Sequence, residues 1–359
     1  MRVGIPTEVK TREGRVGLVP AACAELVRHG HDVVIQQGAG SMSGYGDADY
    51  LAAGARILPD ADAVYGEAEL IVKVKEPVGE ELSRLRREHR LFCFLHLAAN
   101  RELGERLRAI GLTAIAFETV RVDGTLPLLA PMSEIAGHLA VQVGTHLLHQ
   151  PQGGKGMLLG GLAAASRGHV VVLGAGVAGG AAVHTAAALG ARVTVFDVHR
   201  ERMTAMRAMG NNVTALYAYQ QAIGDSLPSA DILIGAVLVP GRRTPHLVTR
   251  EMLREMVPGS VAVDISVDQG GCLETTRPTS YDDPFYVEEG VTHFCVTNMP
   301  GAVPRTSSQA LSASLIPHVL RLAEPDWTDD PALAEGINVR DGAYVNPAVK
   351  AELEGGSGN

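Results

Sequence analysis

Short apolar runs, many of them rich in β-branched residues, alternate along the chain with longer stretches of helical periodicity. Such runs are typical of buried strands, and amphipathic stretches between them are typical of helices. The expected strands lie at 2–5, 32–35, 70–75, 91–95, 113–117, 169–173, 192–196, 231–236 and 260–265. The expected helices include 20–30, 79–88 and 100–110. This alternation predicts an α/β protein built on mostly parallel sheets.

A longer helical stretch at 131–150 separates the two groups of strands. We expect it to carry the chain from a first sheet to a second, and a helix at 308–323 to return to the first. The length of 359 residues also exceeds a comfortable single core. We therefore predict two domains, one of residues 1–130 together with 300–359 and one of residues 131–299. The Gly-rich tail from Glu354 is expected to be disordered.

The run at 169–173 leads directly into Gly174-x-Gly176-x-x-Gly179, and an Ala-rich helical stretch follows. The first Gly of such a loop allows a tight turn, the second lets the backbone approach a pyrophosphate, and the third lets helix and strand pack closely. Asp197 ends the next strand, roughly 20 residues on, where a carboxylate can bind the ribose hydroxyls. The pattern predicts a dinucleotide site in the second domain. A Gly-rich turn without a nucleotide is the alternative.

The residues around Asp197 also bear on the choice of cofactor. A carboxylate at this position repels a 2′-phosphate and accepts hydrogen bonds from ribose hydroxyls, which favours NAD over NADP. His199, Arg200 and Arg202 follow closely and could partly offset that repulsion. We predict NAD as the cofactor.

Composition and charge exclude several classes of partner. The net charge of −9 argues against a nucleic-acid surface and against binding to anionic membranes. The four cysteines are scattered without metal-ligand spacing, so we expect no metal and a reduced, cytoplasmic setting. The N-terminus lacks the apolar core of a signal peptide, and no segment reads as a membrane span.

Ionisable residues follow three strands of the first domain. Lys75 ends an expected strand, His96 and Glu118 each come directly after one, and Arg15 lies in the loop after the first strand. Because ligands of parallel α/β sheets bind beyond the carboxyl ends of the strands, these residues are candidates for a substrate site. In the second domain, Asp268 lies just beyond the strand that ends near residue 265.

These residue types suit hydride transfer with acid/base assistance. Arg15 and Lys75 could clamp a substrate carboxylate, and His96 could shuttle a proton near neutral pH. Asp268 could act as a second acid/base group or stabilise positive charge. The fold class we predict is therefore α/β, with two Rossmann-like doubly wound parallel-sheet domains and a cleft between them for a nicotinamide and a small anionic substrate.

Each of these residues also has a simpler explanation. An Arg in a turn is usually a solvated surface charge, so Arg15 could be one. Lys75 could form an edge ion pair with the adjacent Glu76, and His96 could be a structural residue of its strand. Asp268, in Asp-Gln-Gly-Gly, could only shape a turn. Their shared position at strand ends favours the functional reading.

Several of these residues belong to motifs that closely resemble those of bacterial alanine dehydrogenases. Examples are Val72-Lys-Val-Lys-Glu-Pro77 and Asp268-Gln-Gly-Gly-Cys272. Further similar segments lie at 1–8, 15–20, 95–98, 127–134 and 298–307. The resemblance covers nearly the whole chain. The same superfamily includes the nucleotide-binding subunit of proton-translocating nicotinamide transhydrogenase.

The resemblance implies reversible oxidative deamination, in which L-alanine, NAD and water give pyruvate, ammonium and NADH. It also implies that the protein is a homohexamer. It implies that Arg15 and Lys75 bind the substrate carboxyl and carbonyl groups. It likewise implies that His96 is the general acid/base and Asp268 the second catalytic group. Positions that match the family's substrate pocket are Phe94 and Met132. Positions that match its cofactor contacts are Ser133, Asp197, Arg202, Leu238 and Asn298.

The chain departs from the family pattern at residues 160–168 and at Gly180 and His184. These changes concern cofactor affinity and oligomer contacts. Three rival readings remain open: a paralogue that acts on another small 2-amino acid, a non-catalytic transhydrogenase-like subunit, and an inactive NAD-sensing scaffold. Phe94, Met132 and Leu129 favour a small apolar substrate side chain.

Overall fold

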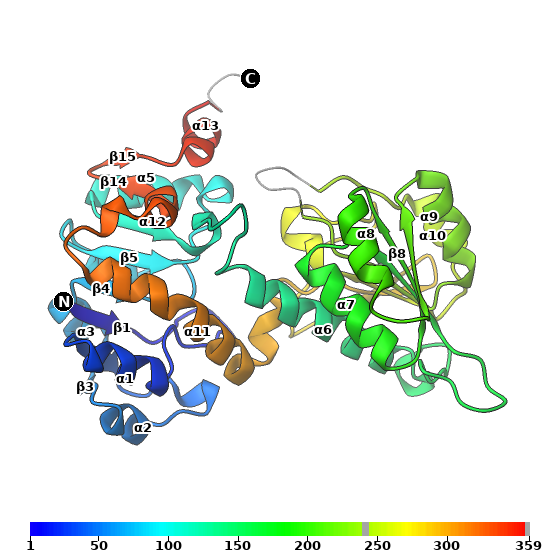
Figure 1. Cartoon of the computed structure of the whole chain (residues 1–359), viewed down its shortest axis with the longest axis horizontal. Coiled ribbons are helices and arrows are strands. Elements are labelled where there is room, and N and C mark those ends of the chain that lie inside the picture. Colours follow the sequence, from blue (N-terminus) through cyan, green and yellow to red (C-terminus); the bar gives the residue numbers. More distant parts are fainter. Residues whose placement is uncertain (239–243, 356–359) are drawn as a thin grey trace. The chain divides into compact units, whose positions relative to one another are not determined.

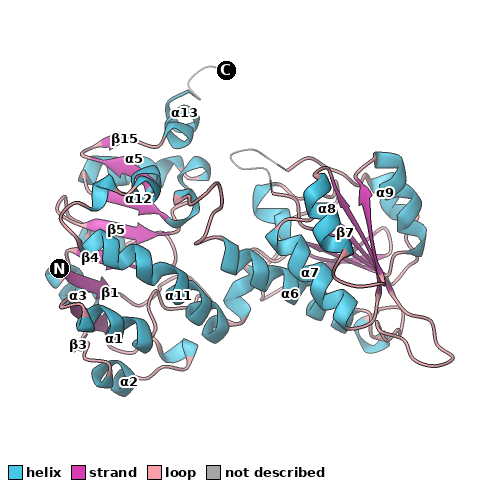
Figure 2. Ribbon diagram, in the orientation of Figure 1, coloured by secondary structure: helices cyan, strands magenta, loops and turns pink. Residues whose placement is uncertain are grey.

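The computed structural model describes residues 1–238 and 244–355. Most of the tail predicted to be disordered, residues 356–359, lies outside the described part. The chain divides into two compact units. The first consists of Met1–Met132 and the chain from Gly301 onward, and the second is Ser133–Pro300. Figure 2 shows a sheet flanked by helices in each unit, so the predicted α/β class is confirmed.

The first unit contains an eight-stranded sheet in the order β15-β14-β6-β5-β4-β1-β2-β3 (Figure 1). The strands from β3 to β6 pair in parallel, and β14 and β15 extend the β6 edge in antiparallel fashion. Their bounds are β1 Arg2–Ile5, β2 Asp32–Gln36, β3 Arg56–Leu58, β4 Leu70–Val72, β5 Arg90–Cys93, β6 Thr113–Ala116, β14 Ile337–Arg340 and β15 Ala343–Tyr344. The sequence order reverses between β1 and β4, so the ligand position expected for such sheets lies beyond these two strands.

The second unit contains a seven-stranded sheet in the order β12-β13-β11-β10-β7-β8-β9. Among the described strands of this sheet, only β12 is antiparallel to its neighbour. The bounds are β7 His169–Leu173, β8 Arg192–Asp197, β9 Val213–Tyr217, β10 Ile232–Gly235, β11 Val261–Asp264, β12 Phe285–Glu288 and β13 Val291–Phe294. Counted from β9, the parallel strands follow the 3-2-1-4-5-6 order of dinucleotide-binding sheets. The reversal lies between β7 and β10.

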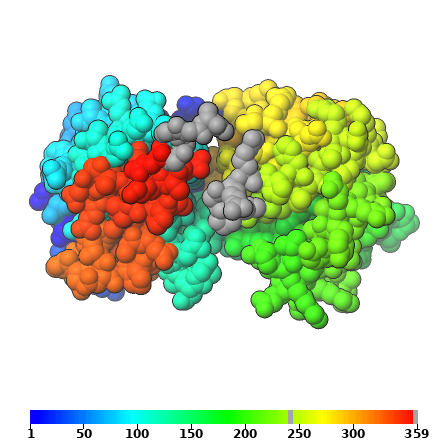
Figure 3. Space-filling view, turned by 90° about the horizontal axis from the view of Figure 1, so that it is seen from above, coloured from blue at the N-terminus to red at the C-terminus, as the bar shows by residue number. Residues whose placement is uncertain are grey.

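Helices cover both sheets, and the long ones agree with the predicted periodicity. Their bounds are α1 Pro20–Arg28, α2 Asp47–Ala52, α3 Ala61–Glu67, α4 Glu81–Arg84, α5 Arg101–Ile110, α6 Ala130–Leu147, α7 Val177–Ala188, α8 Arg200–Arg207, α9 Gln220–Ser226, α10 Arg250–Arg254, α11 Pro304–Ala323, α12 Pro331–Gly336 and α13 Pro347–Gly355. In the described part of the chain, no helix is both long and apolar enough to cross a membrane. In Figure 3 the C-terminal segment, coloured orange to red, forms part of the surface of the first unit.

Three predicted elements, one helix and two strands, differ from the structure. The helix expected at 79–88 is limited to α4, because the chain becomes extended at Leu85, whose side chain is buried. The strands expected at 70–75 and 91–95 end at Val72 and Cys93. Their pairing nevertheless continues, since Lys73 N–H donates to Phe92 O (3.2 Å) and Phe94 N–H donates to Val74 O (3.0 Å). The segments that carry Lys75 and His96 are thereby held side by side.

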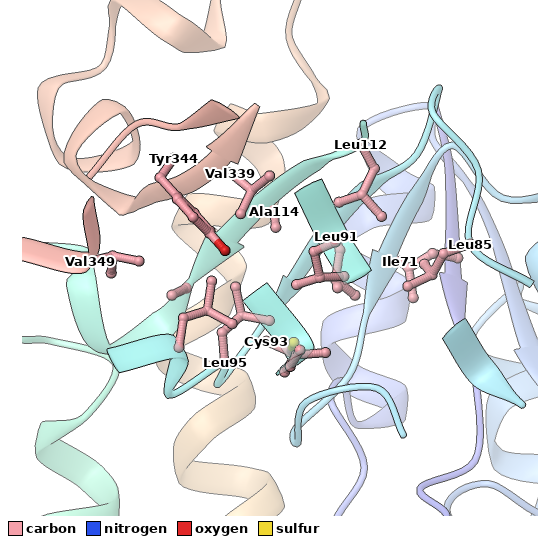
Figure 4. Close-up of a cluster of buried hydrophobic side chains, with 14 of the residues drawn as sticks. Ile71, Leu85, Leu91, Cys93, Leu95, Leu112, Ala114, Val339, Tyr344 and Val349 are labelled. Atoms are coloured by element: carbon pink, nitrogen blue, oxygen red, sulfur yellow. The ribbon is translucent and has the colours of Figure 1, made fainter. Parts of the chain in front are cut away.

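The core of the first unit joins parts of the chain that are far apart in sequence. Figure 4 shows Ile71 of β4 and Leu91 of β5 with Val339 of β14 and Tyr344 of β15. Val349 of α13 packs into the same cluster. Burial of these apolar side chains ties the C-terminal segment to the strands that carry the candidate site.

His169, the first residue of β7, should make the stability of the second unit sensitive to acid. Its ring is buried, with Nδ1 3.0 Å from Ser229 Oγ and Nε2 2.9 Å from Thr194 Oγ1. Burial, together with nearby Arg192, lowers the pKa of His169 to about 4. Since the unfolded chain titrates at about 6.5, the folded state loses stability as the pH falls from about 6.5 towards 4, by up to about 3 kcal/mol.

Urea unfolding at a series of pH values checks this expectation. The His169→Gln variant removes the titrating group and should show a shallower loss of unfolding free energy between pH 6.5 and 4. An identical pH dependence in the variant and the parent protein would contradict the assignment.

Candidate active site

Arg15 lies beyond β1 in the first unit, and it is almost completely buried at 2% exposure. Its Nε donates to Glu13 Oε1 (2.6 Å) and its NH2 group donates to Glu13 Oε2 (2.5 Å). Its NH1 group lies 3.2 Å from Met132 Sδ. The reading of Arg15 as a solvated surface charge is therefore wrong. The structure brings Arg15 and Met132 together, as a shared substrate pocket requires.

Lys75 lies beyond β4, the other strand at the reversal of sequence order. Burial lowers the pKa of Lys75, and the positive charge of nearby Arg15 lowers it further. The carboxylate of the adjacent Glu76 forms an ion pair with Lys10. Two cationic groups thus share the end of the sheet where a small anion would bind.

A buried charged cluster next to Lys75 was not predicted from the sequence. Lys73 lies 3.3 Å from Glu8 Oε2 and 3.0 Å from Glu81 Oε1, and all three side chains are buried. Burial by itself would lower the pKa of Lys73, but Glu8 and Glu81 outweigh it and raise the pKa. Burial raises the pKa of Glu8. The feature of the sequence that could have indicated this cluster is Lys73, a charged residue within the apolar run at 70–75.

His96 follows β5 and is exposed, with a left-handed backbone at φ +50°. Its N–H donates to Glu118 Oε1 (2.6 Å), and the N–H of Leu95 lies 3.2 Å from the same oxygen. The His96 ring stacks on Phe94 at a centroid distance of 5.7 Å and an interplanar angle of 6°. Phe94 in turn meets Phe117 edge-on at 5.0 Å. The predicted residues Phe94, His96 and Glu118 therefore lie together, and Glu118 holds the backbone that presents the imidazole.

The glycine loop in the second unit has the close contacts that its pattern predicts. Gly174 has φ +96°, and a Cβ there would lie 2.6 Å from Ala236 O. A Cβ on Gly179 would lie 1.8 Å from Gly174 O. Gly176 has open space at its Cβ position and is the N-cap of α7, without a side-chain cap. The backbone at Gly176 is therefore accessible, as an approach by a pyrophosphate requires.

Asp197 ends β8 and is tied to the glycine loop. Its Oδ2 accepts the N–H of Ala175 (2.7 Å), while Oδ1 accepts the backbone N–H of His199 (2.8 Å) and lies 2.8 Å from His199 Nδ1. Arg202 NH1 is 3.9 Å from Oδ2. Burial alone would raise the pKa of Asp197, but these hydrogen bonds and the nearby Arg202 outweigh it and lower the pKa. The carboxylate is thus anionic at neutral pH.

The remaining predicted residues occupy different parts of the second unit. Asp268 is exposed in the short 3₁₀ helix Ile265–Gln269, a single tight turn directly after β11. Buried Asp264 shapes this turn by accepting the N–H groups of Ser266 (2.9 Å) and Cys272 (2.7 Å). Three candidate cofactor residues are half-buried or exposed, namely Ser133 in α6, Leu238 beyond β10 and Asn298 before the turn Met299–Ala302.

In the first unit, Arg15, Lys75 and His96 lie beyond the carboxyl ends of β1, β4 and β5. In the second unit, the glycine loop follows β7 and Asp268 follows β11. The cleft between the domains stays a prediction, since each unit is described by itself. Among the described residues, no group of three or more His, Cys, Asp or Glu side chains could hold a metal ion. Sequence reasoning missed Glu13, the bidentate partner of Arg15. Its signal was a carboxylate two residues from Arg15, in the same loop after the first strand.

Comparison with known proteins gives two family matches that together span most of the chain. Residues 4–136 match the N-terminal domain of alanine dehydrogenase/PNT, and residues 140–347 match its C-terminal domain. An alanine dehydrogenase of Mycolicibacterium smegmatis is 48% identical over 360 residues, which cover 99% of this chain and 97% of the relative. An alanine dehydrogenase of Bacillus subtilis is 44% identical, with 98% and 95% covered.

The solved structures give the same result. A structure of L-alanine dehydrogenase matches with a TM-score of 0.95 at 47% identity, and 99% of each chain is covered. A transhydrogenase from Sinorhizobium meliloti matches with a TM-score of 0.85 at 29% identity, with 97% of this chain and 100% of that chain covered. Full-length similarity at this level, on a chain that carries the expected motifs, leads to one conclusion: the chain belongs to the alanine dehydrogenase/PNT family.

Proposed function

We propose that this protein catalyses the reversible oxidative deamination of L-alanine with NAD and water to pyruvate, ammonium, NADH and a proton. The observation that carries the proposal is the buried Arg15 beside Lys75, on the strand end next to that of His96. Two cationic side chains that can bind a carboxylate, with a histidine nearby that can transfer a proton, suit a 2-amino acid as substrate. The glycine loop and Asp197 of the second unit suit NAD, which supplies the hydride acceptor when bound.

Each candidate residue has a proposed role in this reaction. Arg15 and Lys75 bind the substrate carboxyl and carbonyl groups, and Phe94 and Met132 border the methyl group. His96 takes a proton from the water that adds to the imino acid and returns one to the departing ammonia, and Asp268 is the second catalytic group. Residues that contact the cofactor are Ser133, Gly174, Gly176, Gly179, Asp197, Arg202, Leu238 and Asn298.

The function is tested by NADH formation from L-alanine at alkaline pH, where release of a proton favours the oxidative direction. A panel that includes serine and glycine distinguishes alanine dehydrogenase from a paralogue with another small 2-amino acid. A transhydrogenase-like subunit or an NAD-sensing scaffold would bind NAD without oxidising any of them. The dehydrogenase proposal fails if NAD binds and no small amino acid is turned over.

We expect NAD to be used in preference to NADP. The anionic carboxylate of Asp197 would repel a 2′-phosphate, while Arg202 at 3.9 Å only partly offsets that charge. In steady-state assays with alanine, kcat/KM should be at least about tenfold higher with NAD than with NADP. A tenfold ratio corresponds to about 1.4 kcal/mol, which one unfavourable contact between charges can account for. The Asp197→Ser variant should narrow this ratio. Comparable turnover with both cofactors in the parent protein would disprove the preference.

The proposals for assembly and location are supported by the resemblance to the family. We propose a cytoplasmic homohexamer, without nucleic-acid or membrane partners. Light scattering of the purified protein tests the hexamer directly, and a monomeric mass would contradict it.

A further inference from the structure

The three buried side chains Glu8, Lys73 and Glu81, here called the charged cluster, have no role in the proposed chemistry. Lys73 Nζ contacts both carboxylates, at 3.3 Å and 3.0 Å, and Tyr65 O–H donates to Glu81 Oε1 (3.0 Å). Taking such groups out of water is costly, and apolar residues of similar volume would often stabilise a fold as well. Stability alone is therefore a weak explanation for the charged cluster.

The charged cluster holds the backbone of the loop between β4 and α4. Glu8 Oε1 accepts the N–H of Val74 (2.5 Å), and Glu8 Oε2 lies 3.3 Å from the N–H of Lys75. Glu81 Oε2 accepts the N–H of Val78 (3.0 Å) at the other end of the loop. Hydrogen bonds to a carboxylate are stronger than those between neutral groups. The loop that carries Lys75 is thus anchored at both ends.

The position of the charged cluster matches the expected ligand position of the sheet. Glu8 follows β1 and Lys73 follows β4, the two strands between which the sequence order reverses. Arg15 lies in the same loop region as Glu8, and its charge acts on Lys75. Contacts from Glu8 to the backbone of Val74 and Lys75 therefore tie the loop that carries Lys75 to the segment after β1 that also carries Arg15.

We propose that the charged cluster is a positioning unit for Lys75, which sets the backbone of the 73–78 loop so that Lys75 and Arg15 are preorganised to bind the substrate carboxyl and carbonyl groups. The inference rests on the proposed function, because it uses the substrate-binding role of Lys75. A group held in its productive geometry before binding loses less entropy when the substrate arrives.

The charge balance makes Glu8 suitable for a test. Two carboxylates surround one ammonium group, so Glu8→Gln leaves Lys73 and Glu81 as a neutral pair and creates no unpaired buried charge. A Gln has one carbonyl oxygen where the Glu has two carboxylate oxygens. It therefore cannot replace both oxygens that Val74, Lys75 and Lys73 now share.

Steady-state kinetics of the full-length protein give the first measurement. For Glu8→Gln we expect KM for pyruvate to rise by about tenfold, with a smaller change in kcat and an unchanged Kd for NADH. Glu81→Gln keeps the contacts of Glu8 to Val74 and Lys75, so its rise in KM should be smaller. The matched control is Glu80→Gln, whose exposed carboxylate contacts Arg84 and should leave all constants unchanged.

Hydrogen–deuterium exchange of the 73–78 peptide, measured without substrate, is the second measurement. We expect faster exchange in Glu8→Gln than in Glu80→Gln, with no change in the peptides of the second unit. Unchanged exchange and unchanged KM would overturn the proposal. An equal loss of NADH affinity and of pyruvate affinity would also overturn it, since that result indicates general destabilisation.

If Glu8→Gln does not fold, the Glu81→Gln variant tests the proposal in its place. Faster exchange of the 73–78 peptide together with a raised KM for pyruvate supports a positioning role. Unchanged exchange of this peptide overturns the proposal. If the parent protein turns over no amino acid, the proposed function fails. The exchange experiment then still shows whether the charged cluster holds the loop.

Discussion

His96→Ala is expected to lose most of the alanine-dependent NADH formation while it keeps the parent protein's affinity for NAD. A positioned general acid/base contributes typically about 10²–10⁴-fold to rate, so we expect a loss of kcat in that range. The imidazole is exposed and stacks on Phe94 in the first unit, whereas the glycine loop belongs to the second. Turnover and NAD binding, the latter by fluorescence titration, should therefore separate in this variant.

Two further variants separate the imidazole from the backbone it sits on. Because His96 has φ +50°, an alanine there also strains the turn. Asparagine tolerates the left-handed region, so His96→Asn should lose as much activity as His96→Ala with less strain. His29→Ala, which removes an exposed histidine that contacts Glu25, serves as a control and should keep full activity. Unchanged turnover in both His96 variants would remove this residue from the mechanism.

Gly179→Ala is expected to abolish NAD binding or to prevent folding of the second unit. The added methyl carbon would lie 1.8 Å from Gly174 O, which is a backbone atom and cannot rotate away. The loop and the start of α7 would have to separate, and the backbone N–H groups that we propose bind the pyrophosphate would move with them. The NAD dissociation constant and the thermal midpoint, measured together, distinguish the two outcomes.

The neighbouring glycine provides a matched control. A Cβ on Gly180 would lie 3.4 Å from Met206 Cε, which is an ordinary contact with the end of a flexible side chain. Since Gly inside a helix costs about 0.5–1 kcal/mol relative to Ala, Gly180→Ala should bind NAD normally and unfold with a slightly higher free energy. If Gly179→Ala and Gly180→Ala behave alike, the close packing at Gly179 is not what the nucleotide site requires.

The sequence predicted the central strands well and the edges of the sheets poorly. The fully buried runs of β7, β10 and β11 were located to within a residue or two, because both faces of a central parallel strand are covered and nearly every position is apolar. The edge strands β3, β9, β12 and β15 were not predicted, and neither were β13 and β14, which lie next to the edges. β9 contains apolar residues, among them Leu216 and Tyr217, but several of its positions are exposed, and it pairs with β8 alone.

The residues of the candidate site could be predicted from the sequence, but most of their contacts could not. Arg15, Lys75 and His96 could be found because the carboxyl ends of parallel strands converge, which is a property of topology and needs no side-chain detail. Glu118 was placed beside them by the same rule, but its contacts with the N–H groups of Leu95 and His96 could not be predicted. Which carboxylate accepts which donor depends on distances of a few ångströms between separate loops.

The sequence by itself determined the α/β class, the glycine loop with its acidic partner, and the family motifs, because each depends on residues close together in the chain. Only the tertiary structure decided that Arg15 is buried against Glu13 and that Glu8, Lys73 and Glu81 form one cluster. The same holds for the clash that excludes a side chain at Gly179. Hydrogen bonds and close packing act over short distances, so such partners become known only when the chain has brought distant segments together.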